Sequence, residues 1–274
     1  DALLRHFGRI EAIFEADRTS LAAIEGLAPA VIQSILSSHN RLEESQTYVE
    51  SLRERDILIT SRFDAGYPHQ LFELNDPPVM LFCRGHLPIA DKKTIAFMGA
   101  DAATAEGIEM TSRLARLFAK AEVQVVSALS GGISAAAHLA AKSVGFPSFA
   151  VVDAGFDSIV GTVEMALAID IASTGGLVAE YVPDAPPAKD ALAQSNRLMV
   201  GLANAVIFTE LYADSARAQD MLEFCNQNGK LTFFFVDPAL GALADERSLQ
   251  RAVENGAILI TGYDMIPDII RSLV

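Results

Sequence analysis

The sequence contains few cysteines and no recognisable metal-binding spacing. Cys83 and Cys225 are its two cysteines, and neither belongs to a CxxC or Cys/His pattern. We interpret them as reduced thiols of a cytosolic protein rather than as a disulfide framework. The five histidines form no HxxxH pair, so the sequence predicts no structural zinc, no other metal and no cofactor bound through such groups.

Long apolar runs are also missing. None reaches the roughly 20 residues that span a bilayer. The longest candidate, Leu231–Val236, has the length of a strand and lies between Gly229 and Pro238. The first residues do not form a signal peptide pattern, so we expect a cytoplasmic protein without membrane contact. The chain begins at Asp1 instead of methionine, which leaves an upstream segment open.

Basic residues are scarce relative to acidic ones. Lysine and arginine total 21 against 35 aspartates and glutamates, a net charge of −14. A non-specific DNA-binding protein is usually basic, and the overall field of this chain repels a polyanion at long range. Nucleic-acid binding must therefore depend on a local site. With 274 residues and a hydrophobic fraction of 51%, the chain is long enough for one large and one small folded domain.

Residues 1–56 predict a small helical N-terminal domain. Thr19 or Ser20 is expected to cap one of its short helices. Residues 24–32 resemble a helix-hairpin-helix motif of the form hxGhGxxxA, whose turn amides can hold a DNA phosphate. Ala28 stands in place of the second glycine, which hinders a close approach of a phosphate to the backbone. Phosphate binding and a purely structural or interaction role both remain open for this hairpin.

Residues 57–90 are interpreted as a connector between the two domains. A polar helix is expected at 41–54, followed by a short strand at 57–60. Turn-forming Gly and Pro residues separate this strand from a second one at 79–82. We place the domain boundary at 90/91.

From Thr94 onward, strand and helix patterns alternate regularly. Strands are expected at 94–98, 123–127, 148–152, 177–180, 205–210, 231–236 and 257–260, and helices at 107–120, 133–143, 159–169, 191–203, 214–228, 246–255 and 263–272. Continuous apolar strands separated by amphipathic helices predict a parallel sheet covered on both faces. Right-handed crossovers make residues 91–274 a doubly wound, mainly parallel, Rossmann-like α/β domain.

Ligands of such sheets bind beyond the carboxyl ends of the strands, where the strand order reverses. Gly99 follows the first of these strands and precedes the helix expected at 107–120, an arrangement that suits an anion although it is not GxGxxG. After the second strand, which ends at Ser127, come Gly131 and Gly132. Paired glycines at a strand-to-helix turn let a phosphate approach the backbone, or they simply make a tight turn.

Four further side chains are candidates at the same edge. Glu180 and Glu210 each end a strand and can bind a ribose hydroxyl or act as a base. Alternatively, they cap helices or pair with Arg197. Arg197 itself, near a helix start, is the cation most readily assigned to a phosphate, with a salt bridge as the alternative. His138 is either a ligand-edge residue or a packed, helix-capping one.

The order of these turns resembles the DNA-processing protein DprA/Smf family. That family carries a strand followed by GSR, then VSGxAxGIDxxAH, a GxD turn, a G-hydrophobic-SEY segment, an RNR helix start and a late GA, preceded by YP and dPPxxLyxxG. The corresponding segments here are Tyr67–Pro68, Asp76–Gly85, Gly99, Val126–His138, Gly155–Asp157, Gly176–Tyr181, Ser195–Arg197 and Gly256–Ala257. The match keeps its order over about 200 residues.

The resemblance implies single-stranded DNA binding, loading of a RecA-type recombinase, and dimerisation through the Rossmann-like domain. It implies no established catalysis, so we do not expect an enzyme. Carried over to the matching positions, the DNA- or phosphate-binding residues are Gly99, Ser127, Gly131, Gly132, Asn196 and Arg197. Thr104, His138, Glu180 and Glu210 are further ligand-edge candidates.

The chain departs from the family pattern where charge matters. Asp101 replaces the arginine of GSR, a reversal worth on the order of a few kcal/mol against a phosphate at a partly dehydrated site. Ser134 replaces the aspartate of GID, Ser195 replaces the first arginine of RNR, and residues 211–217 replace a stretch rich in glycine and serine. These departures predict weakened DNA binding.

Two other functions stay open at this point. One is a nucleotide sensor or N-glycosidic hydrolase of the same superfamily, although the PGGxGTxxE run of the cytokinin-activating hydrolases is missing. The other is a scaffold that has lost its ligand.

Overall fold

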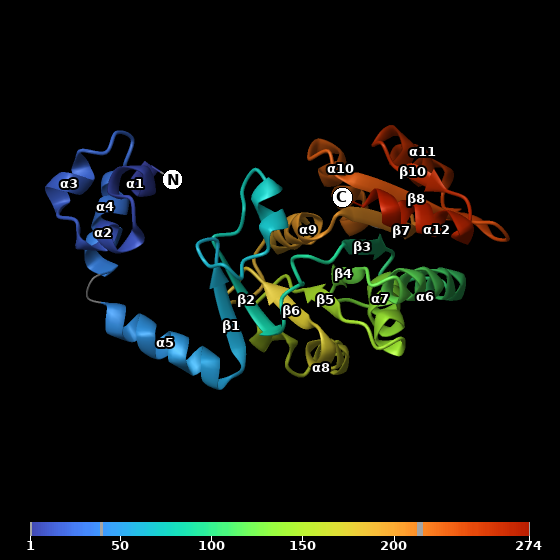
Figure 1. Ribbon diagram of the computed structural model, residues 1–274, viewed down its shortest axis with the longest axis horizontal. Coiled ribbons are helices and arrows are strands. Elements are labelled where there is room, and N and C mark those ends of the chain that lie inside the picture. Colours follow the sequence, from blue (N-terminus) through green and yellow to red (C-terminus); the bar gives the residue numbers. More distant parts are fainter. Residues whose placement is uncertain (1, 39–40, 213–215, 274) are drawn as a thin grey trace. The chain divides into compact units, whose positions relative to one another are not determined.

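The computed structural model describes residues 2–38, 41–212 and 216–273. The chain divides into two compact units, Asp1–Asp56 and Ile57–Val274 (Figure 1). The first residues of the helix predicted at 214–228 lie outside the described residues. The part that is described, α10, spans Ala216–Gln227.

The first unit is helical throughout its described part. Its helices are α1 (Ala2–Phe7), α2 (Ile10–Glu15), α3 (Arg18–Ala22), α4 (Pro29–Ser38) and α5 (Leu42–Glu54). Asp17, not Thr19 or Ser20, is the N-cap of α3, because its side chain accepts a hydrogen bond from the Ser20 amide at 2.7 Å. The predicted cap was therefore wrong: Thr19 and Ser20 lie inside the first turn of the helix. Gly26, with a φ of +80°, turns the chain between α3 and α4.

The second unit is built on a single sheet. Its strands in the described ranges are β1 (Ile57–Ser61), β2 (Met80–Gly85), β3 (Thr94–Gly99), β4 (Gln124–Ala128), β5 (Ser148–Val151), β6 (Gly176–Ala179), β7 (Ala205–Leu211), β8 (Leu231–Asp237), β9 (Gly241–Ala244) and β10 (Ile258–Ile260). They lie in the order β1-β2-β6-β5-β4-β3-β7-β9-β8-β10. The strands from β6 through β3 to β7, β8 and β10 pair in parallel, whereas β1, β2 and the β8–β9 pair are antiparallel.

Residues 57–90 differ from the prediction of a connector. β2 pairs with β6, and β1 pairs with β2, so both strands extend one edge of the sheet. The segment belongs to the second unit and not to a linker. β9 was not predicted, because its four small or apolar residues follow a turn without a strand-length pattern.

Helices cover both faces of this sheet. They are α6 (Ala105–Lys120), α7 (Gly132–Ser143), α8 (Met165–Thr174), α9 (Ala191–Leu202), α10, α11 (Glu246–Glu254) and α12 (Ile266–Ser272), with 3-10 turns η2 (His69–Glu73), η3 (Phe156–Ile159) and η4 (Tyr263–Met265). The helix predicted at 159–169 begins later, because Gly161 at φ +81° interrupts the helical backbone.

Alternate residues of β3 show how the two faces are filled. Ile95 and Phe97 pack into one core with α6, α7 and α12, whereas Ala96 and Met98 pack into the other with α9 and α10. A strand that is apolar on both faces needs helices on both sides, which explains its continuous apolar sequence. The doubly wound, mainly parallel, Rossmann-like α/β fold is therefore confirmed.

β3 occupies the position that matters for ligands. β4 lies on one side of it and β7 on the other, although β7 follows much later in the chain. The chain runs from β3 through β4 and β5 to β6 on one side, and then crosses back to place β7 on the other side of β3, so the strand order reverses at β3. This is the topological switch point of the sheet.

Candidate functional site

A cleft of about 610 Å³ opens at this switch point. Its walls come from the turns after β3, β4, β5 and β7 and from the beginnings of α9 and α10. The polar residues that line it are Asp101, Ser130, Asp153 and Arg217, and the apolar or aromatic ones include Leu129, Leu192 and Tyr212. We call this hollow the edge cleft.

Arg217 is the cation of the edge cleft. Its guanidinium donates to Asp153 Oδ2 at 3.0 Å and to Ser195 Oγ at 3.3 Å. The Arg217 side chain is 13% exposed and that of Asp153 is 48% exposed, so the pair reaches from the interior to solvent. Arg217 was not among the predicted site residues, because it lies in the stretch 211–217 that departs from the family pattern. The sequence feature that could have indicated it is a single arginine at the start of α10, the helix that follows β7.

Asn196 contacts the backbone of this arginine from the protein interior. It is buried, and its side-chain amide donates to the backbone carbonyl of Arg217 at 3.3 Å. Its Oδ1 is buried without a hydrogen-bond partner in the described residues. Asn196 therefore fixes the start of α10 rather than lining the edge cleft.

The amino-terminus of α6 is already occupied by an anion of the protein. The Thr104 amide donates to both carboxylate oxygens of Glu210 at 3.1 Å, and Thr104 Oγ1 donates to Oε2 at 3.2 Å. Glu210 is fully buried, and a Cβ atom on Gly107 would lie 1.7 Å from its Oε2. A carboxylate is stable there because it faces the positive end of the helix dipole. Of the two roles left open for Glu210, the structure shows the helix cap.

The glycines after β3 and β4 allow the turns that follow these two strands to pack closely against each other. Gly132 has a φ of +52°, and a Cβ atom on it would lie 2.3 Å from the carbonyl oxygen of Ala100. The Ile133 amide donates to that same carbonyl at 3.1 Å. Gly99 is equally confined, because a Cβ atom on it would meet Ile133 at 2.6 Å. Gly131 and Gly132 thus pack the second turn onto the first, and Gly99 lines the edge cleft.

Ser127 and His138 lie behind the edge in the protein interior. Ser127 Oγ donates to the carbonyl of Phe97 at 2.7 Å and lies within hydrogen-bonding distance of Ser134 Oγ at 3.0 Å. His138 Nδ1 is 3.0 Å from Ser148 Oγ, and Nε2 is 3.2 Å from the carbonyl of Ala128. Burial lowers the pKa of His138 to about 4, so the ring is neutral. The structure places both residues in packing roles.

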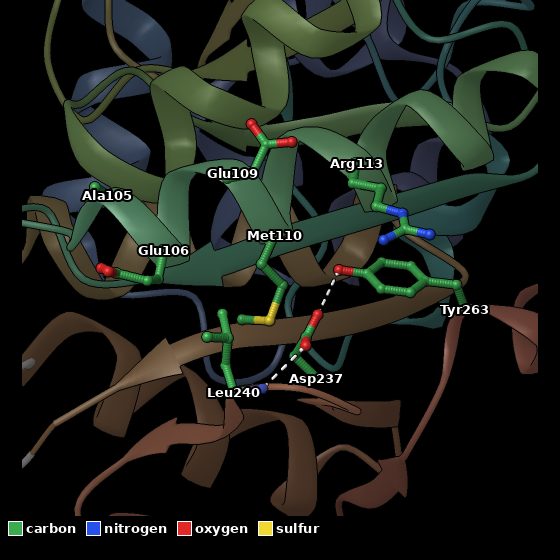
Figure 2. A pocket seen from close by; sticks show the side chains of 8 residues that line it. All are labelled: Ala105, Glu106, Glu109, Met110, Arg113, Asp237, Leu240 and Tyr263. Carbon is green, nitrogen blue, oxygen red and sulfur yellow. Dashed lines mark hydrogen bonds between the residues drawn. The ribbon is translucent and has the colours of Figure 1, made fainter.

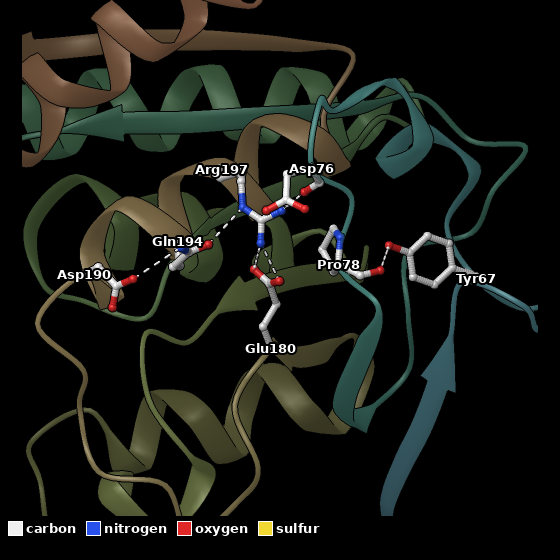
Figure 3. A network of polar contacts seen from close by, with 7 residues as sticks. All are labelled: Tyr67, Asp76, Pro78, Glu180, Asp190, Gln194 and Arg197. Carbon is white, nitrogen blue, oxygen red and sulfur yellow. Dashed lines mark hydrogen bonds and ion pairs between the residues drawn. The ribbon is translucent and has the colours of Figure 1, made fainter. Parts of the chain in front are cut away.

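Arg197 is held in a network of the protein's own groups (Figure 3). It donates to both carboxylate oxygens of Glu180, at 2.5 and 2.6 Å, to the carbonyl of Asp76, and to Gln194 Oε1 at 3.0 Å. The side chains of Arg197 and Glu180 are 13% and 18% exposed. Burial raises the pKa of Glu180, and the Arg197 charge opposes that shift. The salt bridge left open for this pair is what the structure contains.

A second hollow, of about 340 Å³, lies between α6 and the end of β8 (Figure 2). Arg113 stands 3.8 Å from the centre of the Tyr263 ring, and the Tyr263 hydroxyl donates to Asp237 Oδ2 at 2.8 Å. Glu106 and Glu109 also line it. Three carboxylates against one guanidinium make this hollow unsuitable for a phosphate.

The described ranges contain neither a metal-binding cluster nor a membrane-spanning helix. No group of three or more His, Cys, Asp or Glu side chains lies close enough there to hold a metal ion. No helix in those ranges has both the length and the apolar character needed to cross a membrane. Both thiols, Cys83 and Cys225, are free and buried.

The fold is similar to two solved structures of DNA processing protein A. The protein from Streptococcus pneumoniae has a TM-score of 0.78 at 24% identity, with 100% of this chain and 92% of that one covered. The protein from Helicobacter pylori has a TM-score of 0.65 at 23% identity, with 79% and 95% covered. At these identities, the likeness shows the fold.

Sequence comparison extends the likeness to a family. Protein Smf of Synechocystis sp. is 27% identical over 212 residues, which are 76% of this chain but only 53% of that protein, so the chain spans about half its length. DNA processing protein DprA of Streptococcus pneumoniae is 29% identical over 209 residues, 76% of this chain and 73% of that protein. The family model described as DNA recombination-mediator protein A matches residues 58–270. The chain belongs to this family, the family of the DprA and Smf proteins.

Proposed function

We propose that this protein binds single-stranded DNA in the edge cleft and acts as a recombination mediator, without catalysing a reaction. The observation that carries the proposal is Arg217, a largely buried cation in the cleft at the switch point of the sheet. Family membership supports it, and the structure of the Helicobacter pylori neighbour is described as showing a single-stranded DNA binding mode.

The lining of the edge cleft favours a single strand over a duplex. Leu129, Leu192 and Tyr212 give it apolar and aromatic walls. Unpaired bases expose faces that stack on such walls, whereas duplex bases are covered by their neighbours. A volume of about 610 Å³ lies in the range of pockets that enclose a small organic ligand. One nucleotide therefore fits this site.

The charge of the edge cleft makes the binding weak. Among the described residues that line the cleft, Asp101 and Asp153 accompany one guanidinium, that of Arg217. A carboxylate about 5 Å from a phosphate opposes it by about 3 kcal/mol at an effective dielectric constant of about 20. We expect dissociation constants in the micromolar range, as for non-specific nucleic-acid binding and not for a tight specific complex.

The proposal includes two partners that the family resemblance implies. A RecA-type recombinase receives the bound strand, and a second copy of the chain forms a homodimer. Sedimentation velocity tests the dimer, and the rate of recombinase filament formation on a coated single strand tests the loading. A monomer at tens of micromolar protein contradicts the first of these, and an unchanged rate contradicts the second.

Fluorescence anisotropy tests the DNA binding directly. A labelled 20-nucleotide strand of mixed sequence is titrated at about 50 mM salt, in parallel with its duplex. Arg217→Ala should weaken binding about tenfold, whereas Arg251→Ala, which removes an exposed ion-paired arginine on α11, should not. No binding of the single strand at tens of micromolar protein contradicts the proposal. A thermal shift with free nucleotides under the same conditions would then favour a small-nucleotide ligand.

A further inference from the structure

The polar groups of the edge cleft differ from those of a phosphate site. A phosphate offers only acceptors, and its best partners are several donors or cations. The edge cleft instead presents the carboxylates Asp101 and Asp153 beside Arg217 and the hydroxyl of Ser130. The described lining residues thus carry two negative charges and one positive charge. The arrangement suits a neutral group that both donates and accepts hydrogen bonds.

Asp153 is held in place as an acceptor. The bond from Arg217 engages Oδ2 at 3.0 Å, and the arginine is itself 13% exposed, so the carboxylate is oriented before any ligand arrives. Its side chain is 48% exposed, which leaves it accessible from the cleft. A fixed, accessible carboxylate is well suited to accept from an amino group of a ligand.

Two further polar atoms of residues that line the cleft have no hydrogen-bond partner among the described residues. Ser130 Oγ and Arg217 Nε are buried and form no hydrogen bond in the part of the chain that the structure describes. Buried polar atoms in folded proteins nearly always have partners, so such groups in a cleft point to a ligand. Together they can donate to acceptors that lie next to an amino group.

The walls of the cleft complete a site for a flat ring. Tyr212 lines it, and burial and the neighbouring Glu210 carboxylate raise the pKa of its hydroxyl. Leu129 and Leu192 add apolar surface beside the Tyr212 ring. Aromatic and apolar side chains around a few oriented polar groups are typical of sites for unpaired bases.

We propose that the edge cleft recognises a nucleobase with an exocyclic amino group and discriminates against thymine. The inference rests on the proposed single-stranded DNA binding. In this assignment the N4 amine of cytosine donates to Asp153, and its ring nitrogen and O2 are acceptors for Arg217 Nε and Ser130 Oγ, two buried donors that must shift toward the cleft to reach the base. Thymine places a carbonyl oxygen, O4, where cytosine has the amine, so oxygen lone pairs would face the carboxylate.

Two homopolymers of equal length test this. Oligo-dC and oligo-dT of 20 nucleotides carry the same phosphates and are both weakly stacked, so they differ mainly in the base edge. At pH 8, where cytosine is not protonated, we expect oligo-dC to bind about tenfold more tightly, the effect of one well-placed pair of hydrogen bonds. Equal affinities overturn this inference and leave the proposed function intact. Failure of both strands to bind overturns the proposed function as well.

Matched variants locate the preference. Asp153→Asn carries an amide that can accept or donate, so the ratio of the two affinities should fall to within about twofold. Asp220→Asn removes the same charge from an exposed position on α10 and should keep the ratio. Melting curves check that each variant is folded. The comparison of oligo-dC with oligo-dT in the unmodified protein does not depend on the variants. An unchanged ratio in folded Asp153→Asn overturns the assignment to Asp153.

Discussion

Replacement of Arg197 by methionine tests whether this residue stabilises the fold or binds DNA. Methionine keeps most of the aliphatic volume and removes the charge. Glu180, 18% exposed, then loses the bidentate partner at 2.5 and 2.6 Å, and the carbonyl of Asp76 loses its donor. Breaking one side of a buried ion pair costs about 3–5 kcal/mol. Because this pair is partly exposed, we expect a loss of about 3 kcal/mol in the free energy of unfolding.

Urea unfolding at pH 7 measures this loss, and a double-mutant cycle with Glu180→Gln separates the pair from its surroundings. We expect the double variant to be more stable than the sum of the two single losses predicts, by about 2 kcal/mol. Losses that add to within about 0.5 kcal/mol would show that the two side chains are not coupled. DNA affinity should stay within about twofold of the original, because Arg197 does not line the edge cleft.

The same variant has a defined pH dependence. Burial raises the pKa of the Glu180 carboxyl, and without Arg197 nothing opposes that shift. A carboxyl whose pKa is higher in the folded state binds more protons there, so its stabilising contribution is present at low pH and is lost as the pH rises. The deficit of Arg197→Met relative to the original protein should therefore shrink between pH 7 and pH 5.5. A deficit that grows over this interval would refute the assignment.

Three further changes have distinct expected outcomes. Burial lowers the pKa of His138 from 6.5 to about 4, so the free energy of unfolding should fall by up to about 3 kcal/mol as the pH drops through this window. In His138→Gln, urea unfolding should show a weaker dependence of stability on pH over the same range. Glu210→Gln removes the charge at the amino-terminus of α6 and should lower the stability by about 1 kcal/mol, measured in the same way. Arg217→Ala should weaken single-strand binding while the slope of log affinity on log salt changes by less than about 0.7, the loss that one phosphate contact would give.

Much of the fold was predictable because its signals are local. Continuous apolar segments such as 94–98 and 205–210 became strands buried on both faces, as β3 and β7 are. The place of β1 and β2 was not predictable in the same way. Both strands were expected. Their membership of the sheet depends on the pairing of β2 with β6, which is distant in the sequence, and no local pattern in either segment indicates this pairing.

The candidate site shows the same division. Gly99 and Gly132 were found because close backbone approach requires glycine, whatever the approaching group is. The approaching group is the backbone of the neighbouring turn at Gly132, and the Ile133 side chain with the Glu210 carbonyl at Gly99. Glu210 reaches Thr104 across 106 positions, and Arg197 reaches Asp76 across 121, so neither partner is apparent from spacing. Arg217 was not predicted as a site residue, because residues 211–217 were interpreted only as the loss of the family's glycine- and serine-rich stretch.

In the part of the chain that the structure describes, three positive positions of this sheet edge are each matched by a carboxylate of the protein itself. Glu210 occupies the helix end at Thr104, Glu180 holds Arg197, and Asp153 holds Arg217. The first two carboxylates are nearly or fully buried, so a phosphate can displace only Asp153, which is 48% exposed. A base in the edge cleft needs no such displacement, because it uses the acceptor that Arg217 has already fixed. The net charge of −14 adds to the same bias, since phosphates outside the cleft meet a repulsive field. If the proposed binding of a single strand is correct, short-range contacts with bases are therefore the interactions that favour it in this acidic member of the family.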